Sequence, residues 1–201
     1  MPQIKTKRDR VKFASDNVTG ACPEVLDAIL KANDGDRTPY GNDEISKSLQ
    51  DKFSEIFEKE VIVFPTSSGT AANALALSTM TPSFGNIYCH KLSHINVDEC
   101  GAPEFYTGGA KLVTLKGDDG KITAEELNKS IHGKGIVHHT QPSSVSITQL
   151  CETGEAYKLD EIKKISEIAH NHKLNMHMDG ARFANALVSL NCSPAEMTWK
   201  S

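Results

Sequence analysis

Short apolar runs alternate along this chain with longer segments in which apolar residues recur at helical spacing. Within 159–172, for example, Leu159, Ile162 and Ile165 share one helical face. The predicted helices are 23–33, 43–59, 69–80, 122–131 and 159–172. The predicted strands are 61–64, 86–90, 111–115, 135–140 and 174–179. This alternation predicts an α/β fold in which a mostly parallel sheet has helices on both faces.

Charge and composition exclude several classes of protein. The net charge is −4, with 38% hydrophobic and 24% charged residues, which favours neither nucleic acid nor an anionic membrane as a partner. The basic N-terminal segment lacks the apolar core of a secretory signal, and no apolar run approaches the length of a membrane span. The cysteines are widely scattered and form no CxxC pair, which favours a reducing, cytoplasmic setting over a disulfide framework. They are Cys22, Cys89, Cys100, Cys151 and Cys192.

The eight histidines do not have the spacing expected of a metal site. His138 and His139 are adjacent and would face opposite sides of a strand. His170 and His172 are two residues apart on a predicted helix, which also separates their side chains. We therefore expect no metal and interpret the histidines as surface residues or as satisfied core residues.

The segment 65–73, PTSSGTAAN, directly follows the predicted strand 61–64 and opens a predicted helix. A turn of this kind points backbone N–H groups and the positive end of a helix dipole at one spot. The hydroxyls of Ser68 and Thr70 add donors, so the pattern suits a phosphate dianion. It is neither a Walker loop nor a GxGxxG dinucleotide fingerprint, and a capped helix after a tight turn would look the same.

Two further segments contain candidate residues at the carboxyl ends of predicted strands. Ligands of parallel sheets bind at this edge. His94 could stack on a flat ligand or move a proton, although a loop histidine bonded to backbone is the simpler alternative. We expect Asp98 and Glu99 to orient neighbours, to cap a helix or to remain solvated.

The second of these segments contains HMDGARF, 177–183. Asp179 ends a strand, where it could bind a protonated ring nitrogen, and Arg182 could hold a carboxylate. The alternative is a local salt bridge between the two. A phosphate cradle, a ring-stacking histidine and an acid with an arginine, in this order, match the large domain of fold-type I pyridoxal phosphate (PLP) enzymes.

Seven segments make the resemblance more specific. They are 15–20 (SDNVTG), 38–43 (TPYGND), 67–77 (SSGTAANALAL), 93–105 (SHINVDECGAPEF), 108–112 (GGAKL), 177–187 (HMDGARFANAL) and 193–199 (SPAEMTW). With them the chain resembles the low-specificity L-threonine aldolases, within the aromatic amino acid β-eliminating lyase/threonine aldolase family. The resemblance runs from about residue 13 to the last residue, and DECGAPE and DGARFANA are its most specific parts.

The resemblance implies a site for PLP and for an amino acid substrate. Ser68, Gly69 and Thr70 would cradle the cofactor phosphate. His94 would stack on the pyridine ring and assist proton transfer, and Asp179 would pair with the ring nitrogen. Ser15 and Arg182 would hold the substrate carboxylate, with Tyr40 and 149–154 nearby. The implied reaction is reversible cleavage of L-threonine, or a related β-hydroxy-α-amino acid, to glycine and an aldehyde, in a homodimer or homotetramer.

The family pattern also implies features that we do not find in the 201 residues. The lysine that forms an imine with the cofactor should lie on the strand after the final helix, and the helix start at 193–199 comes close to the end of the sequence. We therefore expect an N-terminal arm over 1–12, a truncated PLP-binding large domain over 13–201 and no small C-terminal domain. We expect no efficient aldolase activity from these residues alone.

Three alternatives remain open at the level of sequence. The same logic of phosphate, histidine and aspartate would serve another fold-type I enzyme, such as an aminotransferase or a relative of cysteine desulfurases. The chain could be a non-catalytic fragment that binds cofactor weakly or serves as a partner subunit. A metal-dependent hydrolase that uses the histidines is the third alternative.

Overall fold

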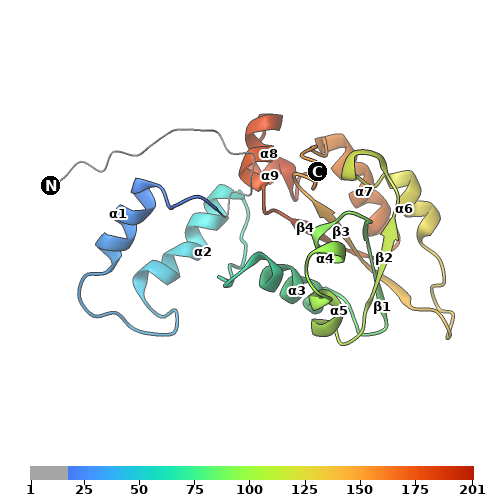
Figure 1. Ribbon diagram of the computed structural model, residues 1–201, viewed down its shortest axis with the longest axis horizontal. Helices are drawn as coiled ribbons and strands as arrows, with labels where there is room; N and C mark the ends of the chain where they lie inside the picture. The colour runs from blue at the N-terminus through green and yellow to red at the C-terminus, as the bar shows by residue number, and fades with distance from the viewer. Residues whose placement is uncertain (1–17) are drawn as a thin grey trace. The chain divides into compact units, whose positions relative to one another are not determined.

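The computed structural model of the chain describes residues 18–201, so Ser15 and the expected arm over 1–12 lie outside the described residues. The chain divides into two compact units, Met1–Ser46 and Lys47–Ser201. Figure 1 labels the helices and strands of the chain. No helix between residues 18 and 201 is long and apolar enough to cross a membrane.

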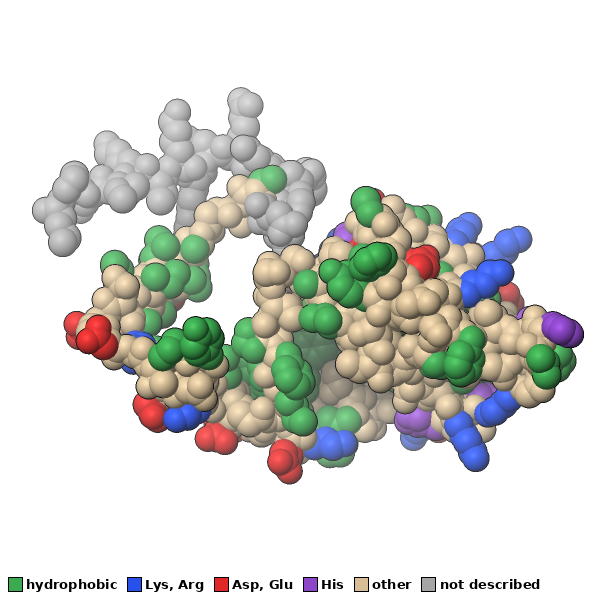
Figure 2. All heavy atoms as spheres, turned by 90° about the horizontal axis from the view of Figure 1, so that it is seen from below, with side chains coloured by type: hydrophobic (Ala, Val, Ile, Leu, Met, Phe, Trp, Pro, Cys, Tyr) green, Lys and Arg blue, Asp and Glu red, His purple; other side chains and the backbone are tan. Residues whose placement is uncertain are grey.

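Helix α1 (Pro23–Ala32) belongs to the first unit and begins with a proline in its first turn, as the sequence predicts. Its apolar stripe is uncovered: Leu26 is 51%, Ile29 58% and Leu30 71% exposed. Figure 2 shows these apolar side chains gathered over the helix.

Helix α2 (Glu44–Ile56) begins directly after Asp43, and confirms the helix predicted over 43–59. The carboxylate of Asp43 accepts hydrogen bonds from the backbone N–H and the hydroxyl of Ser46, at 2.9 and 2.6 Å. These bonds satisfy a donor that the first turn of a helix leaves without an intrahelical acceptor.

The second unit is built on one parallel sheet with the strand order β2-β1-β3-β4. Its strands are β1 (Gly85–His90), β2 (Lys111–Leu115), β3 (Gln141–Thr148) and β4 (Asn175–Asp179). Thr148 pairs with Asp179 in the register of β3 and β4. The carboxyl ends of these two strands therefore lie side by side, as the predicted parallel α/β fold requires.

Helices cover both faces of this sheet (Figure 1). The helical elements after α2 are α3 (Gly69–Met80), α4 (His94–Val97), α5 (Ala102–Tyr106), the 3₁₀ turn η2 (Asp118–Gly120), α6 (Ala124–Ser130), α7 (Leu159–Asn171), α8 (Phe183–Leu190) and α9 (Pro194–Met197). Side chains alternate between faces along β1, so Tyr88 packs in one core cluster and Ile87 in another. Tyr88 packs on the side of α6 and α7, whereas Ile87 packs on the side of α3. The three-layer α/β prediction is confirmed.

The strand predicted at 61–64 is wrong, because this segment lies outside the sheet. Its alternate side chains are bare: Ile62 is 76% and Phe64 79% exposed. The N–H of Val63 donates to the side-chain oxygen of Gln50 at 3.2 Å instead of to a neighbouring strand. An apolar pattern alone does not make a strand when the segment has no partner to supply ladder hydrogen bonds.

The strand predicted at 135–140 is also misplaced, since these residues form turns and β3 follows at Gln141–Thr148. This strand is central but contains buried serines, which is why its apolar signal is weak. The Ser144 hydroxyl lies 2.6 Å from that of Thr81, and the Ser146 hydroxyl lies 2.9 Å from Nδ1 of His177. Because both hydroxyls have partners, neither serine is buried with an unsatisfied side chain.

The contrast between β3 and 61–64 can be tested with two matched substitutions. Ile147 on β3 is 2% exposed, so Ile147→Ala should lower the free energy of unfolding by about 2–5 kcal/mol. Ile62→Ala should change it by no more than about 0.5 kcal/mol, because Ile62 is 76% exposed. Urea unfolding measures both values, and a similarly large loss at Ile62 would contradict the unpaired placement of 61–64.

The buried imidazole of His177 predicts a specific pH dependence of stability. Burial lowers the pKa of His177 to about 4, and the charge of Asp179 only partly opposes this effect. Below about pH 6.5 the unfolded chain therefore binds a proton that the folded chain does not. As a result, the free energy of unfolding decreases as the pH is lowered from about 6.5 to about 4. Between pH 7 and pH 5 the unaltered chain should lose about 2 kcal/mol more of its unfolding free energy than His177→Gln, which cannot titrate there. Equal losses in urea unfolding would contradict the buried, neutral imidazole.

Candidate functional site

Strand ends and helix starts of the second unit carry several of the predicted site residues. Asp179 is the last residue of β4, and His94 opens α4 shortly after the end of β1. Gly69 is the first residue of α3, which packs beside β4 and β3. The structure thus places residues from three separate sequence segments at the carboxyl edge of the sheet.

Asp179 is 7% exposed, and both of its carboxylate oxygens accept hydrogen bonds. Oδ1 accepts from the backbone N–H of Ala181 at 3.0 Å. Oδ2 accepts from the side-chain amide of Asn73, also at 3.0 Å. The carboxylate is therefore fixed in orientation at the strand end, where a ligand of a parallel sheet is expected.

Asn73 belongs to the second turn of α3 and was not among the predicted site residues. It is 6% exposed, and the same Nδ2 that donates to Asp179 also donates to Oε1 of Glu99 at 2.8 Å. The sequence does contain a signal for it: an asparagine among the small and apolar residues of GTAANALAL. If such a helix is buried, the amide needs hydrogen-bond partners.

His94 is linked to the same cluster through Glu99. Its Nδ1 lies 2.8 Å from Oε1 of Glu99, whose side chain is fully buried, whereas the His94 side chain is 38% exposed. The hydrogen bond to Glu99 raises the pKa of His94; partial burial opposes it, and the charges of Glu99, Glu152 and Asp179 add to the increase. The alternative of a loop histidine bonded to backbone is therefore wrong, and Glu99 orients a neighbour, as one of its expected roles implies.

The start of α3 has backbone donors for which the helix itself supplies no acceptor. The Ser68 hydroxyl accepts from the N–H of Ala71 at 3.2 Å and caps the helix. The N–H groups of Gly69 and Thr70 lie in the first turn, where a helix supplies no acceptor. A Cβ built on Gly69 would meet nothing within 4 Å, so the space around this turn is open.

Arg182 precedes α8 and pairs with Glu152 rather than with Asp179. Its Nη2 lies 3.2 Å from Oε2 of Glu152, and the other oxygen of that carboxylate is buried with no partner among the described residues. The local Asp179–Arg182 salt bridge that the sequence left open is thus not formed in the described part of the chain. Gln149, in contrast, turns its side chain away to the backbone of Tyr157, with two bonds of 2.9 Å.

Two other residues considered from the sequence, Ser15 and Tyr40, are not part of the described cluster. Ser15 falls outside the described residues. Tyr40 belongs to the first unit and is 97% exposed. Lys200, which follows α9, pairs with Glu58 at 2.7 Å.

Other histidines contact groups outside the cluster, and the rings of His132 and His139 contact each other with their centroids 6.4 Å apart. Nε2 of His172 lies 3.0 Å from the side-chain oxygen of Asn128, and Nε2 of His90 lies 3.2 Å from the carbonyl oxygen of Gly117. Within residues 18–201 there is no cluster of three or more histidine, cysteine, aspartate or glutamate side chains that could hold a metal ion.

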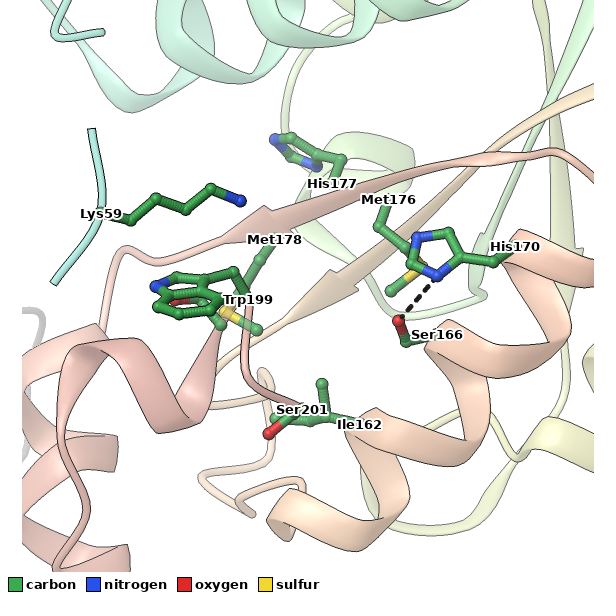
Figure 3. Close-up of a pocket in the computed structure, with 10 residues that line it drawn as sticks. Lys59, Ile162, Ser166, His170, Met176, His177, Met178, Trp199 and Ser201 are labelled. Carbon is green, nitrogen blue, oxygen red and sulfur yellow. Dashed lines mark hydrogen bonds between the residues drawn. The ribbon is translucent and has the colours of Figure 1, made fainter. Parts of the chain in front are cut away.

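A cavity of about 380 Å³ lies beside β4, between α7 and the residues that follow α9 (Figure 3). Its lining includes Met176, Met178 and Trp199, and none of the predicted site residues. The cavity and the polar cluster are therefore different places. We base the candidate site on the cluster, because there the buried Asp179, Asn73 and Glu99 are joined to His94.

The β-eliminating lyase family matches residues 12–200 of the chain. The low specificity L-threonine aldolase of Pseudomonas sp. (strain NCIMB 10558) is 44% identical over 190 residues, which cover 94% of this chain and 55% of that protein. The enzyme of the same name from Pseudomonas aeruginosa is 41% identical, with the same coverage. The chain thus spans about half the length of the curated relatives it matches.

Solved structures agree with this comparison. A threonine aldolase from Leishmania major superposes with a TM-score of 0.83 at 29% identity, over 90% of this chain and 53% of that one. Serine palmitoyltransferase from S. paucimobilis superposes with a TM-score of 0.55 at 19% identity, over 78% of this chain and 37% of that one. The second likeness concerns the fold alone.

Proposed function

The chain belongs to the β-eliminating lyase family, and on this basis we propose that it is the cofactor-binding part of a PLP-dependent aldolase. The whole protein would cleave L-threonine, L-allo-threonine and related β-hydroxy-α-amino acids to glycine and an aldehyde. The observation that carries the proposal is the buried, doubly hydrogen-bonded Asp179 at the end of β4, linked through two side chains to His94. Relatives with this aldolase name, at 44% and 41% identity, support the substrate class.

The described residues fit PLP in charge and in hydrogen-bonding capacity. Ser68, Gly69 and Thr70 would hold the phosphate at the open start of α3, where donors are free and a dipole favours an anion. Asp179 would accept from the protonated ring nitrogen, and His94 would stack on the ring. When bound, PLP supplies an electron-poor ring that accepts the electron pair left at Cα when the Cα–Cβ bond breaks.

The side chains of this part of the protein would bind the substrate and move its proton. Nε2 of His94 would take the β-hydroxyl proton while the Cα–Cβ bond breaks and the hydroxyl carbon becomes the aldehyde carbonyl. Cα then takes up a proton to give glycine. Asp179 would keep the ring nitrogen protonated, because a neutral pyridine accepts the electron pair less well.

Arg182 would hold the substrate carboxylate, together with Ser15. The guanidinium already bonds Glu152 through Nη2, at 3.2 Å. A guanidinium has five N–H donors, so it can keep Glu152 and bind a second carboxylate. The pair with Glu152 would then orient Arg182 before substrate arrives.

The proposal includes an organisation for the whole protein. Residues 1–12 would form an N-terminal arm and 13–201 the PLP-binding large domain. The imine-forming lysine and a small domain would belong to the part of the relatives' length that this chain does not span. We propose a homodimer or homotetramer in the cytoplasm.

The activity is tested by expressing the whole open reading frame, including any codons that follow the codon for Ser201. The product is incubated with PLP and L-threonine, L-allo-threonine or phenylserine, and glycine and aldehyde are measured. We expect both products in equal amounts. Transfer of the amino group to a keto acid without aldehyde release would instead favour an aminotransferase.

Cofactor binding can be tested on the 201-residue chain itself. Asp179→Asn should weaken PLP binding about 10- to 100-fold, because a hydrogen bond to a charged group contributes about 1.5–3 kcal/mol. Titration of the cofactor absorbance gives the dissociation constants. Asp160→Asn, which removes an exposed carboxylate on α7, should bind PLP as the unaltered chain does. Equal affinities for Asp179→Asn and the unaltered chain would contradict the role given to Asp179.

A further inference from the structure

Four side chains form one line of hydrogen bonds across the candidate site. Nδ2 of Asn73 donates to Oδ2 of Asp179 at 3.0 Å and to Oε1 of Glu99 at 2.8 Å, and Glu99 Oε1 lies 2.8 Å from Nδ1 of His94. We propose that Asn73 and Glu99 are positioning residues, which fix the tautomer of His94 and tie its orientation to that of Asp179. The catalytic meaning of this proposal rests on the proposed function, but the positioning itself does not.

The orientation of the Asn73 amide follows from counting donors. A side-chain amide has two N–H donors on one nitrogen, and here each donor has its own carboxylate. The flipped amide would place its oxygen against two carboxylate oxygens and would lose both hydrogen bonds. Asn73 therefore has one allowed orientation, and that orientation holds Glu99 and Asp179 at a set separation.

The same counting assigns the hydrogen of His94. Carboxylate Oε1 of Glu99 is an acceptor, so the 2.8 Å contact requires the hydrogen on Nδ1 of His94. In the neutral imidazole this leaves a lone pair on Nε2, the atom that would take the β-hydroxyl proton. The opposite tautomer would have a hydrogen on Nε2 and could not accept one.

Burial makes this arrangement hard to replace. The Glu99 side chain is fully buried, and its Oε2 has no partner among the described residues. A buried carboxylate is costly unless it is paired and hydrogen-bonded, so Glu99 depends on both Asn73 and His94. Both described side-chain partners of Glu99, Asn73 and His94, belong to the candidate site.

Three carboxylates raise the pKa of His94, and one of them is paired with an arginine. Glu99, Glu152 and Asp179 each raise the pKa of His94, with the Glu99 hydrogen bond as the largest cause, and partial burial lowers it. Arg182 neutralises part of the Glu152 charge through their ion pair. Glu99 is the only one of these groups described in direct contact with the ring, so its removal should dominate any change.

The test uses the whole 201-residue chain, labelled with ¹⁵N-histidine, without cofactor or substrate. Long-range ¹H–¹⁵N spectra report the tautomer of each histidine, and a pH titration reports each midpoint. In the unaltered chain we expect the Nδ1–H tautomer for His94. Its assignment comes from the signal that disappears in His94→Gln.

Three variants separate charge, hydrogen bonding and local sequence. In Glu99→Gln the amide oxygen can still accept from Asn73 and His94, so the Nδ1–H tautomer should remain while the His94 midpoint moves to lower pH. In Glu99→Leu both the midpoint and the tautomer should change. Asp98→Asn removes an exposed negative charge from the neighbouring position and should change neither.

The role of Asn73 is tested with Asn73→Leu, which keeps the size of the side chain but has no donor. We expect His94 to become a mixture of tautomers, because Glu99 loses the bond that holds it in place. An unchanged tautomer in Asn73→Leu and Glu99→Leu would overturn the proposal, as would an equal midpoint change in Asp98→Asn and Glu99→Gln. If either leucine variant fails to fold, the comparison of Glu99→Gln with Asp98→Asn still decides the role of Glu99.

A kinetic measurement on the active gene product links the positioning to catalysis. Neutral His94 would be the form that accepts the proton, so kcat/KM should rise with pH through the His94 midpoint. In Glu99→Gln this rise should move to lower pH, and it should not move in Asp98→Asn. Failure to cleave threonine would refute the proposed function and leave the tautomer result standing, whereas an unshifted rise in an active Glu99→Gln enzyme would refute the positioning role.

Discussion

Parallel pairing of β1, β3 and β4 is the constraint on which the rest of the second unit depends. Parallel strands have their carboxyl ends at one edge of the sheet, and the register that pairs Thr148 with Asp179 brings two such ends side by side. The loop after β1 adds His94 at the same edge, and α3 starts there after the Ser-Gly-Thr turn. If one strand ran in the opposite direction, its terminal side chain would lie at the far edge and the cluster would not form.

The edge is polar, and the fold compensates for burying it. Asn73, Glu99 and Asp179 are each less than a tenth exposed, although a buried polar group without a partner costs about 1–3 kcal/mol. The amide of Asn73 serves two carboxylates at once, and His94 brings a third donor to the cluster. The same logic operates inside the sheet, where Ser146 and His177 satisfy one another between β3 and β4. Buried polar pairs of this kind hold the strands and the candidate site in one geometry.

Periodicity predicted the helices well, because a long amphipathic segment needs only a core to pack on. Helix α7 is amphipathic, and it differs from its prediction by a single residue. Helix α3 begins and ends as predicted, although its residues are small and mostly apolar and have no amphipathic pattern. The strands were harder. Residues 61–64 have the composition of a strand but no paired neighbour among the described residues, and β3 is central but rich in serine. Short strands depend on partners distant in sequence, and a local pattern does not contain those partners.

The sequence by itself determined the alternation of helices and strands, the Ser-Gly-Thr turn before α3, and the placement of His94 and Asp179 after strands. These features depend on near neighbours along the chain, through helix periodicity, capping and the exit of a strand into a loop. Only the tertiary structure decided that Arg182 pairs with Glu152 and that Asn73 joins Glu99 to Asp179. Asn73 and Asp179 are 106 positions apart, so their hydrogen bond exists only because sheet order and register bring α3 against β4.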